Sequence, residues 1–286
     1  MKDDDTTTTQ RRRLRSHFGF SKMPFCKAMW AAHMFDSSAQ RELLSSLGMW
    51  IEVKGIALVS GPSGVGKSIT LRRFAQQLDE ARYRVIDFAY VPCTITGFLR
   101  SLNRKLGLPM RLHTVDLFDA AQNHLATFEQ EHGPHPVVIL DDAEGLRVEA
   151  IDTIRRLTSY ELDSEDRFSV LISGTDEVLE LLRHPDLAPL RTRVSYAQNL
   201  KPFGLEDTTN YVRFHLARAD VDPKLFTDAA VKRLFQASQG RPRGINQLAV
   251  QALIQAAVLG RDSVDGNQMS SLIAAHPFYQ GYGADR

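Results

Sequence analysis

The sequence has little of what an extracellular or membrane protein needs. It contains two cysteines, Cys26 and Cys93, which lie far apart and share no metal-ligand spacing. A disulfide framework is therefore not expected, and a reducing compartment fits. No run approaches the ~18 uninterrupted apolar residues of a membrane-spanning helix. A secretion signal has an apolar segment after its first residues, whereas residues 1–5 are acidic and no apolar segment follows them. We expect a soluble, cytoplasmic protein.

Charge of one sign is also lacking, because the formal net charge of the 286 residues is +1. Bulk charge therefore identifies no partner, and a nucleic-acid binder with this balance would need its basic residues gathered on one face. One local cluster, Arg11-Arg12-Arg13-Leu14-Arg15, lies within residues 1–16, which we expect to form a disordered arm. The cluster is either a solvated tail or an arm that contacts nucleic-acid phosphates.

What the sequence does contain, from Ile56 to about Leu200, is an alternation of apolar strands and amphipathic helices. This order predicts an α/β fold with a parallel sheet flanked by helices on both faces. A strand covered on both faces reads as a nearly continuous apolar run, as residues 136–140 do. The expected strands are 56–60, 84–90, 136–140, 168–173 and 193–196, and the expected helices are 69–79, 95–106, 115–130, 148–159 and 177–182.

After Pro202 the pattern becomes helical only, with helices expected over 205–217, 228–239 and 243–259. The break at Gly240-Arg241-Pro242 separates the last two of them. We therefore expect an α/β domain over 17–202, a small all-helical lid domain over 203–276 and an irregular tail over 277–286.

The most specific motif is Gly61-Pro62-Ser63-Gly64-Val65-Gly66-Lys67-Ser68, which follows a predicted strand and opens a predicted helix. This is the phosphate-binding P-loop pattern in its confirming context. Its glycines let backbone N–H groups surround phosphates, and the helix directs its positive dipole end at the same anion. Lys67 would contact the outer phosphates of ATP, and the Ser68 hydroxyl would bind Mg²⁺. The residues expected to bind the nucleotide here are Gly61, Pro62, Ser63, Gly64, Val65, Gly66, Lys67, Ser68 and Ile69.

A second motif is the apolar strand that ends in Asp141-Asp142. Ligands of open α/β sheets bind at the carboxyl edge of the sheet, so Asp141 is expected beside the phosphate loop as a magnesium ligand. Asp142 is the first candidate for the general base that orients the attacking water, and Glu144 is the other.

Three further groups are candidates. Thr175, at the end of the fourth strand, would sense the γ-phosphate, or it simply caps the helix that follows. Arg191 and Arg193 could project from the subunit edge and act in trans on the transferring phosphoryl group, or they are surface arginines. Arg243 could fold over the nucleotide, or it belongs to a basic surface turn.

Taken together, these motifs resemble an AAA+ ATPase over residues 18–259. Within AAA+ proteins the chain is similar to the group of general secretion pathway A-type ATPases and transposition helper ATPases of the TniB, TnsC and IstB kind. Four segments resemble that group's motifs: 17–25 its "FGF…PF" entry, 140–144 its "IDEAQ" segment, 174–193 its "GQPEL…L..R.R" stretch, and 240–246 its "G.PR.IN" turn.

The resemblance implies roles by position. Lys67 and Ser68 are Walker A, and Asp141 and Asp142 are Walker B. Thr175 occupies the first-sensor region, Arg191 or Arg193 is the arginine finger, and Arg243 is the second sensor. Two departures matter, because Asp142 stands where the group has glutamate and Thr175 where it has glutamine or asparagine. The first departure predicts slow hydrolysis.

The function expected from the resemblance is that of a transposition helper. Such proteins use ATP to form rings or filaments on double-stranded DNA and deliver a transposase. Secretion-type members carry a membrane segment and a cell-wall-binding region after the ATPase, and neither pattern follows residue 276. The alternative is a soluble secretion-associated or regulatory AAA+ ATPase that remodels protein and binds no DNA.

A DNA surface is expected in the segment after the second strand, which would line the channel of a ring. Its hydroxyls and cations suit phosphate contacts that do not read sequence. An ordinary basic helix face is the other interpretation. The candidate DNA contacts are Thr94, Thr96, Arg100, Arg104 and Lys105.

Overall fold

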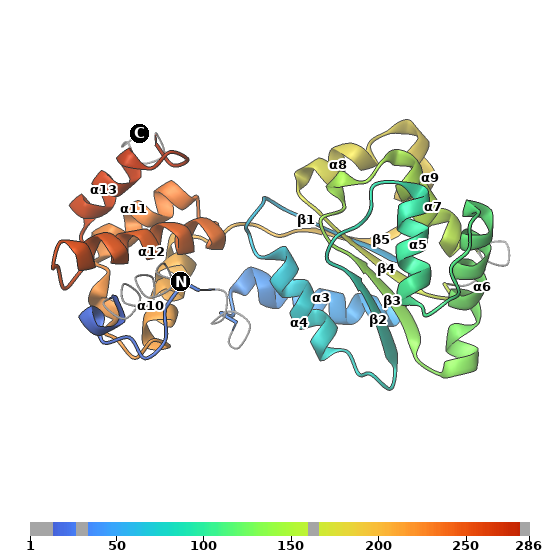
Figure 1. Ribbon diagram of the computed structural model, residues 1–286, viewed down its shortest axis with the longest axis horizontal. Helices are drawn as coiled ribbons and strands as arrows, with labels where there is room; N and C mark the ends of the chain where they lie inside the picture. The colour runs from blue at the N-terminus through green and yellow to red at the C-terminus, as the bar shows by residue number, and fades with distance from the viewer. Residues whose placement is uncertain (1–13, 27–33, 160–165, 281–286) are drawn as a thin grey trace, which may run out of the picture. The chain divides into compact units, whose positions relative to one another are not determined.

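The computed structural model describes residues 14–26, 34–159 and 166–280, which form two compact units (Figure 1). The α/β unit holds residues 39–63 and 67–201. The helical unit holds the residues up to Ser38, the short segment Gly64–Gly66, and the residues from Pro202 onward. The expected domain limits stay predictions, and this grouping differs from them by placing the segment before Ser38 with the C-terminal helices. Of the expected disordered arm, residues 1–13 lie outside the described residues, whereas residues 14–18 are helical.

A five-stranded sheet forms the centre of the α/β unit, in the order β2-β3-β4-β1-β5. All four strand pairings are parallel, which confirms the predicted fold. The inner strands β1, β3 and β4 are buried along their whole length, whereas the edge strands β2 and β5 alternate. The bounds are β1 Ile56–Ser60, β2 Tyr83–Phe88, β3 His135–Leu140, β4 Ser169–Ser173 and β5 Val194–Asn199.

Helices cover both faces of this sheet (Figure 1). One face packs against α5, α6 and α7 through alternate strand residues such as Leu58, Val138 and Ile172. The other face lies against α3 and α4, where Trp50 contacts Phe74 at a ring-centroid separation of 6.5 Å. The bounds are α3 Ser38–Val53, α4 Lys67–Gln77, α5 Ile95–Lys105, α6 Thr114–His132, η1 Ala143–Gly145, α7 Val148–Thr158, α8 Asp176–Leu182, η3 Pro185–Leu187 and α9 Ala188–Arg191.

The helical unit has its own apolar core, to which the segment before Ser38 contributes. Phe20 and Phe25 are 4% and 3% exposed in it, and the Ser21 N–H donates to the Ala219 carbonyl at 3.1 Å. Helices α10 and α12 are joined by the Asn246 amide, which donates to the Tyr211 hydroxyl at 2.9 Å. The bounds are α10 Leu205–Ala217, η4 Pro223–Leu225, α11 Asp228–Ser238, α12 Pro242–Val258 and α13 Gly266–Ala275.

Helices α3 and α13 are the longest described helices that lie outside the elements predicted from the sequence. Helix α3 buries Leu43, Leu47 and Trp50 at helical spacing, although the chain before it carries no strong start signal. Helix α13 is short and begins with glycine, and its start is fixed by the Asp265 carboxylate, which accepts the Gln268 N–H at 2.7 Å. Among the described residues, no helix combines the length and the apolar composition that crossing a bilayer requires.

Burial of His215 makes the stability of the helical unit depend on pH. The ring is 1% exposed, and desolvation lowers its pKa from 6.5 to about 4. Between these values the unfolded chain binds a proton that the folded chain does not. The contribution of His215 to the free energy of unfolding is therefore fully present above about pH 6.5 and is lost as the pH decreases toward 4. The expected loss between pH 7 and pH 4.5 is roughly 2–3 kcal/mol.

The measurement is chemical denaturation at both pH values for the wild type, His215→Phe and the exposed-site control His113→Gln. His215→Phe should lose clearly less stability on acidification than the other two proteins. Equal losses in all three would mean that His215 does not titrate between the folded and unfolded states.

Candidate nucleotide-binding site

The loop between β1 and α4 is shaped by a close backbone approach. Gly61 has φ +149°, and a Cβ there would lie 2.5 Å from the Leu200 carbonyl oxygen. Only glycine fits without moving the chain. Helix α4 begins at Lys67, directly after the loop, so its unpaired N–H groups and positive dipole end lie at this point. This is the strand–loop–helix arrangement that the motif predicts.

Lys67 carries a positive charge in a buried position. Its side chain is 6% exposed, and Nζ donates to the carbonyls of Gly61 at 2.7 Å and Pro62 at 3.3 Å. Burial lowers the pKa of Lys67, while four carboxylates oppose that shift, in the order Glu144, Asp141, Asp142 and Asp176. Four acids at the carboxyl edge of the sheet therefore favour the charged form of Lys67.

Three side-chain oxygens at this edge are buried and have no hydrogen-bond partner among the described residues. They are Asp141 Oδ1, after β3, and Ser173 Oγ and Thr175 Oγ1, at the end of β4. Buried polar atoms are almost always paired, so such a group points to a ligand. A carboxylate and hydroxyls are the hard oxygen donors that Mg²⁺ and its shell prefer. The residues present therefore fit a magnesium ion and a phosphate chain, with Ser68 exposed at the start of α4.

The two candidates for the base lie differently. Glu144 Oε2 accepts the Thr175 N–H at 3.2 Å, and a Cβ on Gly174 would lie 2.8 Å from that oxygen. Glu144 thus links the loop after β3 to the end of β4. Asp142 is exposed and has φ +52°, an uncommon backbone conformation for aspartate that is found at functional sites. Its carboxylate does not cap η1.

Sequence reasoning missed a polar link behind the loop. The Asn199 amide, at the end of β5, donates to Ser60 Oγ at 3.0 Å and to Asp176 Oδ1 at 2.9 Å. Asp176 also acts on the charge of Lys67. These residues are far apart in sequence, and β5 pairs with β1 only in the folded sheet. A polar residue at the end of a strand was the one available signal.

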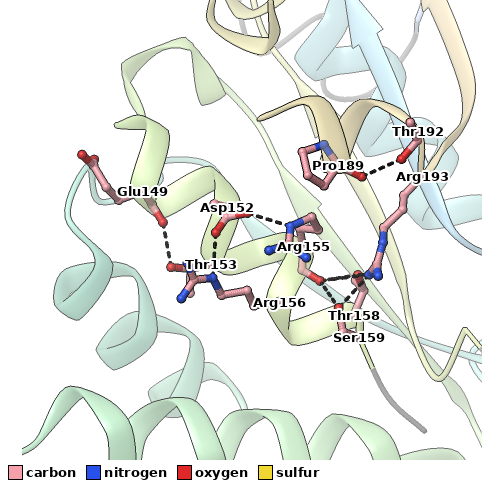
Figure 2. Close-up of polar contacts among 10 residues, drawn as sticks. All are labelled: Glu149, Asp152, Thr153, Arg155, Arg156, Thr158, Ser159, Pro189, Thr192 and Arg193. Atoms are coloured by element: carbon pink, nitrogen blue, oxygen red, sulfur yellow. Dashed lines mark hydrogen bonds and ion pairs between the residues drawn. The ribbon is translucent and has the colours of Figure 1, made fainter. Parts of the chain in front are cut away.

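The paired arginines are both engaged within their own subunit. The Arg191 guanidinium donates to the carbonyls of Leu182 and His184. Arg193 reaches the C-terminal end of α7, where it donates to the Arg155 carbonyl at 3.3 Å, Thr158 Oγ1 at 3.2 Å and Ser159 Oγ at 2.8 Å (Figure 2). A cation at the negative end of a helix is stabilising. Neither arginine contacts Lys67 or Asp141 in any described hydrogen bond or ion pair.

The remaining predicted residues are dispersed. Arg243 lies in the first turn of α12, in the helical unit, and its role toward a nucleotide stays a prediction. Two of the predicted DNA contacts have hydroxyls that serve the fold: Thr94 caps α5 by accepting the Gly97 N–H at 3.2 Å, and Thr96 Oγ1 lies 2.9 Å from Thr114 Oγ1. Arg100, Arg104 and Lys105 are exposed on α5.

Part of the chain is similar to a known domain family. Residues 51–182 match the family model of the AAA domain. The parallel sheet, the loop and the acids at its edge form a P-loop nucleotide-binding fold, and the matched part of the chain is similar to the AAA domain.

Individual relatives are distant. General secretion pathway protein A of Aeromonas hydrophila is 29% identical over 257 residues, which cover 86% of this chain and 45% of that protein. The chain therefore spans less than half the length of this curated relative. The crystal structure of Cdc6p from Pyrobaculum aerophilum is similar with a TM-score of 0.60 and 20% identity, over 87% of this chain and 68% of that one. The RuvB Holliday junction branch migration motor of Thermotoga maritima is similar with a TM-score of 0.54 and 17% identity, over 88% and 72%. At these identities the structures show the fold alone.

Lys67→Ala should abolish ATP binding at micromolar nucleotide, because it removes the cation that would face the phosphates. A titration with fluorescent ATP measures this. The exposed Lys105→Ala is the matched control, and circular dichroism verifies that both variants fold. If folded Lys67→Ala binds ATP with the affinity of the wild type, the assignment of the nucleotide site is wrong.

Asp142→Asn and Glu144→Gln should separate the two candidate bases. Both variants keep the magnesium-ligand candidate Asp141, so ATP should still bind. The variant that lacks the base should lose most of its turnover, about 10²–10⁴-fold. Phosphate release under saturating ATP measures this. If Asp142→Asn turns over like the wild type and Glu144→Gln does not, the base is Glu144. Wild-type turnover in both would exclude both carboxylates.

Proposed function

We propose that this chain is a magnesium-dependent ATPase that assembles on double-stranded DNA and acts as a transposition helper, with a transposase as its client. The observation that carries the ATPase part is the buried Lys67 ammonium beside the unpartnered Asp141 oxygen at a P-loop. A magnesium ion would supply the missing partner of the Asp141 oxygen, and the phosphates of a nucleotide would give the Lys67 ammonium an anionic partner.

The residues would divide the work as follows. The loop N–H groups and Lys67 bind the phosphates, while Ser68 and Asp141 hold the ion. Bound magnesium would neutralise charge on the transferring phosphoryl group. Asp142 or Glu144 accepts the proton of the attacking water. Because Glu144 bonds to the Thr175 N–H, any movement of Thr175 toward a phosphate is passed to Glu144.

The DNA part rests on the charge of the α5 surface. No Asp or Glu occurs between Asp87 and Asp116. Arg100 and Arg104 are exposed, and no ion pair joins either to an acid among the described residues. On α7, by contrast, Asp152 holds both Arg155 and Arg156 at 2.7 Å. Uncompensated cations on one face suit phosphate contacts, which bind DNA without reading its sequence.

The second candidate is a secretion-associated AAA+ ATPase that remodels protein and does not bind DNA. The relative at 29% identity, general secretion pathway protein A, favours it. Filter binding of double-stranded DNA with ATP, ADP or no nucleotide separates the candidates. ATP-stimulated binding that weakens steeply with salt supports the helper function, whereas no binding at any salt supports the alternative. A cytoplasmic location stays a prediction under either proposal.

Replacing Arg191 and Arg193 by alanine should prevent ATP-dependent assembly and cooperative DNA binding while sparing nucleotide binding to the monomer. The reason is that an arginine acting in trans completes the site only between subunits, so ATP at the junction stabilises the oligomer. Sedimentation with ATP and DNA at low salt measures this. A wild-type protein that stays monomeric there would defeat the proposal.

A mixing experiment controls for the fold role of Arg193 at the end of α7. The double arginine variant is combined with Lys67→Ala, and ATP turnover of the mixture is compared with that of each protein alone. Action in trans predicts partial recovery, because some junctions then contain an intact loop facing intact arginines. If the arginines act only within their own subunit, the mixture shows no recovery.

A further inference from the structure

Exposed apolar side chains gather in one loop of the α/β unit. The apolar loop, defined as residues 109–115, lies between α5 and α6 and includes the first two residues of α6. It presents Met110, Leu112 and Val115 with 60%, 83% and 68% of their surface exposed. Single exposed apolar residues need no explanation, but several together indicate a binding surface. None of the residues assigned to the nucleotide site lies in this loop.

The apolar loop is held firmly at both ends. At its start, the N–H groups of Gly107 and Leu108 donate to the carbonyls of Arg104 at 3.1 Å and Asn103 at 2.9 Å, which ends α5 in a Schellman-type turn. The Asn103 side chain is fully buried and donates to the carbonyls of Leu99 and Leu117 at 2.8 and 2.9 Å, so it joins α5 to α6. The exposed apolar side chains therefore lie on a backbone whose start is fixed by hydrogen bonds to α5, and α5 is itself joined to α6.

The surroundings of these side chains are basic. Arg111 stands between Met110 and Leu112, and Arg104 lies in the last turn of α5. Both are exposed, and no acid pairs with either in the described part of the chain. The occupant must therefore be anionic and must also accept bulky apolar side chains. Duplex DNA meets both conditions at its minor groove, where Leu, Met and Pro wedges enter between base steps and arginines follow the backbone.

We propose that the apolar loop is a minor-groove wedge, in which Met110 and Leu112 insert between base pairs while Arg104 and Arg111 contact the flanking phosphates, so that bound DNA is bent. This inference rests on the proposed DNA-binding function and adds to it a binding mode. It assigns the apolar and the charged side chains separate effects. The apolar side chains should govern the bending of DNA, and the arginines should govern the salt dependence of the affinity.

The test uses the full chain and a duplex of about three helical turns with a fluorophore at each end, bound in the presence of ATP. Met110→Ser/Leu112→Ser should weaken binding by about 10–100-fold and abolish the bending-dependent energy transfer, with an unchanged slope of affinity against salt. Arg111→Ala should instead reduce the slope of log affinity against log salt concentration by about one, because one phosphate contact is lost. The control is Val258→Ser, which removes an 80% exposed apolar side chain from the helical unit.

The outcomes separate this inference from the proposed function. If the wild type bends DNA and the double serine variant does not, the wedge is supported. If the variant binds and bends DNA like the wild type, the wedge is wrong while the proposed function stands. If the wild type binds no DNA at low salt, the proposed function itself fails. Binding to vesicles of anionic lipid that requires Leu112, with no such requirement on DNA, overturns the wedge in favour of a lipid surface.

Discussion

The site depends on one electrostatic constraint, the burial of the Lys67 ammonium among carboxylates. Desolvation alone would favour the neutral amine, and the charges of Glu144, Asp141, Asp142 and Asp176 act against that loss. The same acids repel one another unless cations are present. The four acids outnumber the one ammonium, so a bound cation would reduce their mutual repulsion, and a magnesium ion that accompanies a nucleotide is such a cation.

The strand order brings these charges together. Strands β3, β4 and β1 are neighbours in a parallel sheet, so the residues that follow each of them meet at one edge. β5 adds the link from Asn199 to Ser60 and Asp176. The Glu144–Thr175 hydrogen bond connects two of these strand ends. This bond links the loop after β3 directly to the end of β4.

Local patterns made much of this predictable. The limits of β1 and α10 follow from apolar spacing, and the P-loop follows from its glycines and the lysine. What could not be predicted is non-local. The contacts of Arg193 with the end of α7 join residues more than 30 positions apart, so no local pattern indicates them (Figure 2). Packing of Phe20 and Phe25 with α10 likewise joins segments separated by most of the chain.

The most direct test of the account is a calorimetric titration of ATP into the wild type and Asp141→Asn, each with and without Mg²⁺. If the unpartnered Asp141 oxygen is a metal ligand, the wild type binds one nucleotide per chain and Mg²⁺ tightens that binding. In Asp141→Asn, where Lys67 is intact, ATP should still bind but Mg²⁺ should add little. The same gain from Mg²⁺ in both proteins, or no ATP binding by the wild type, would contradict the account.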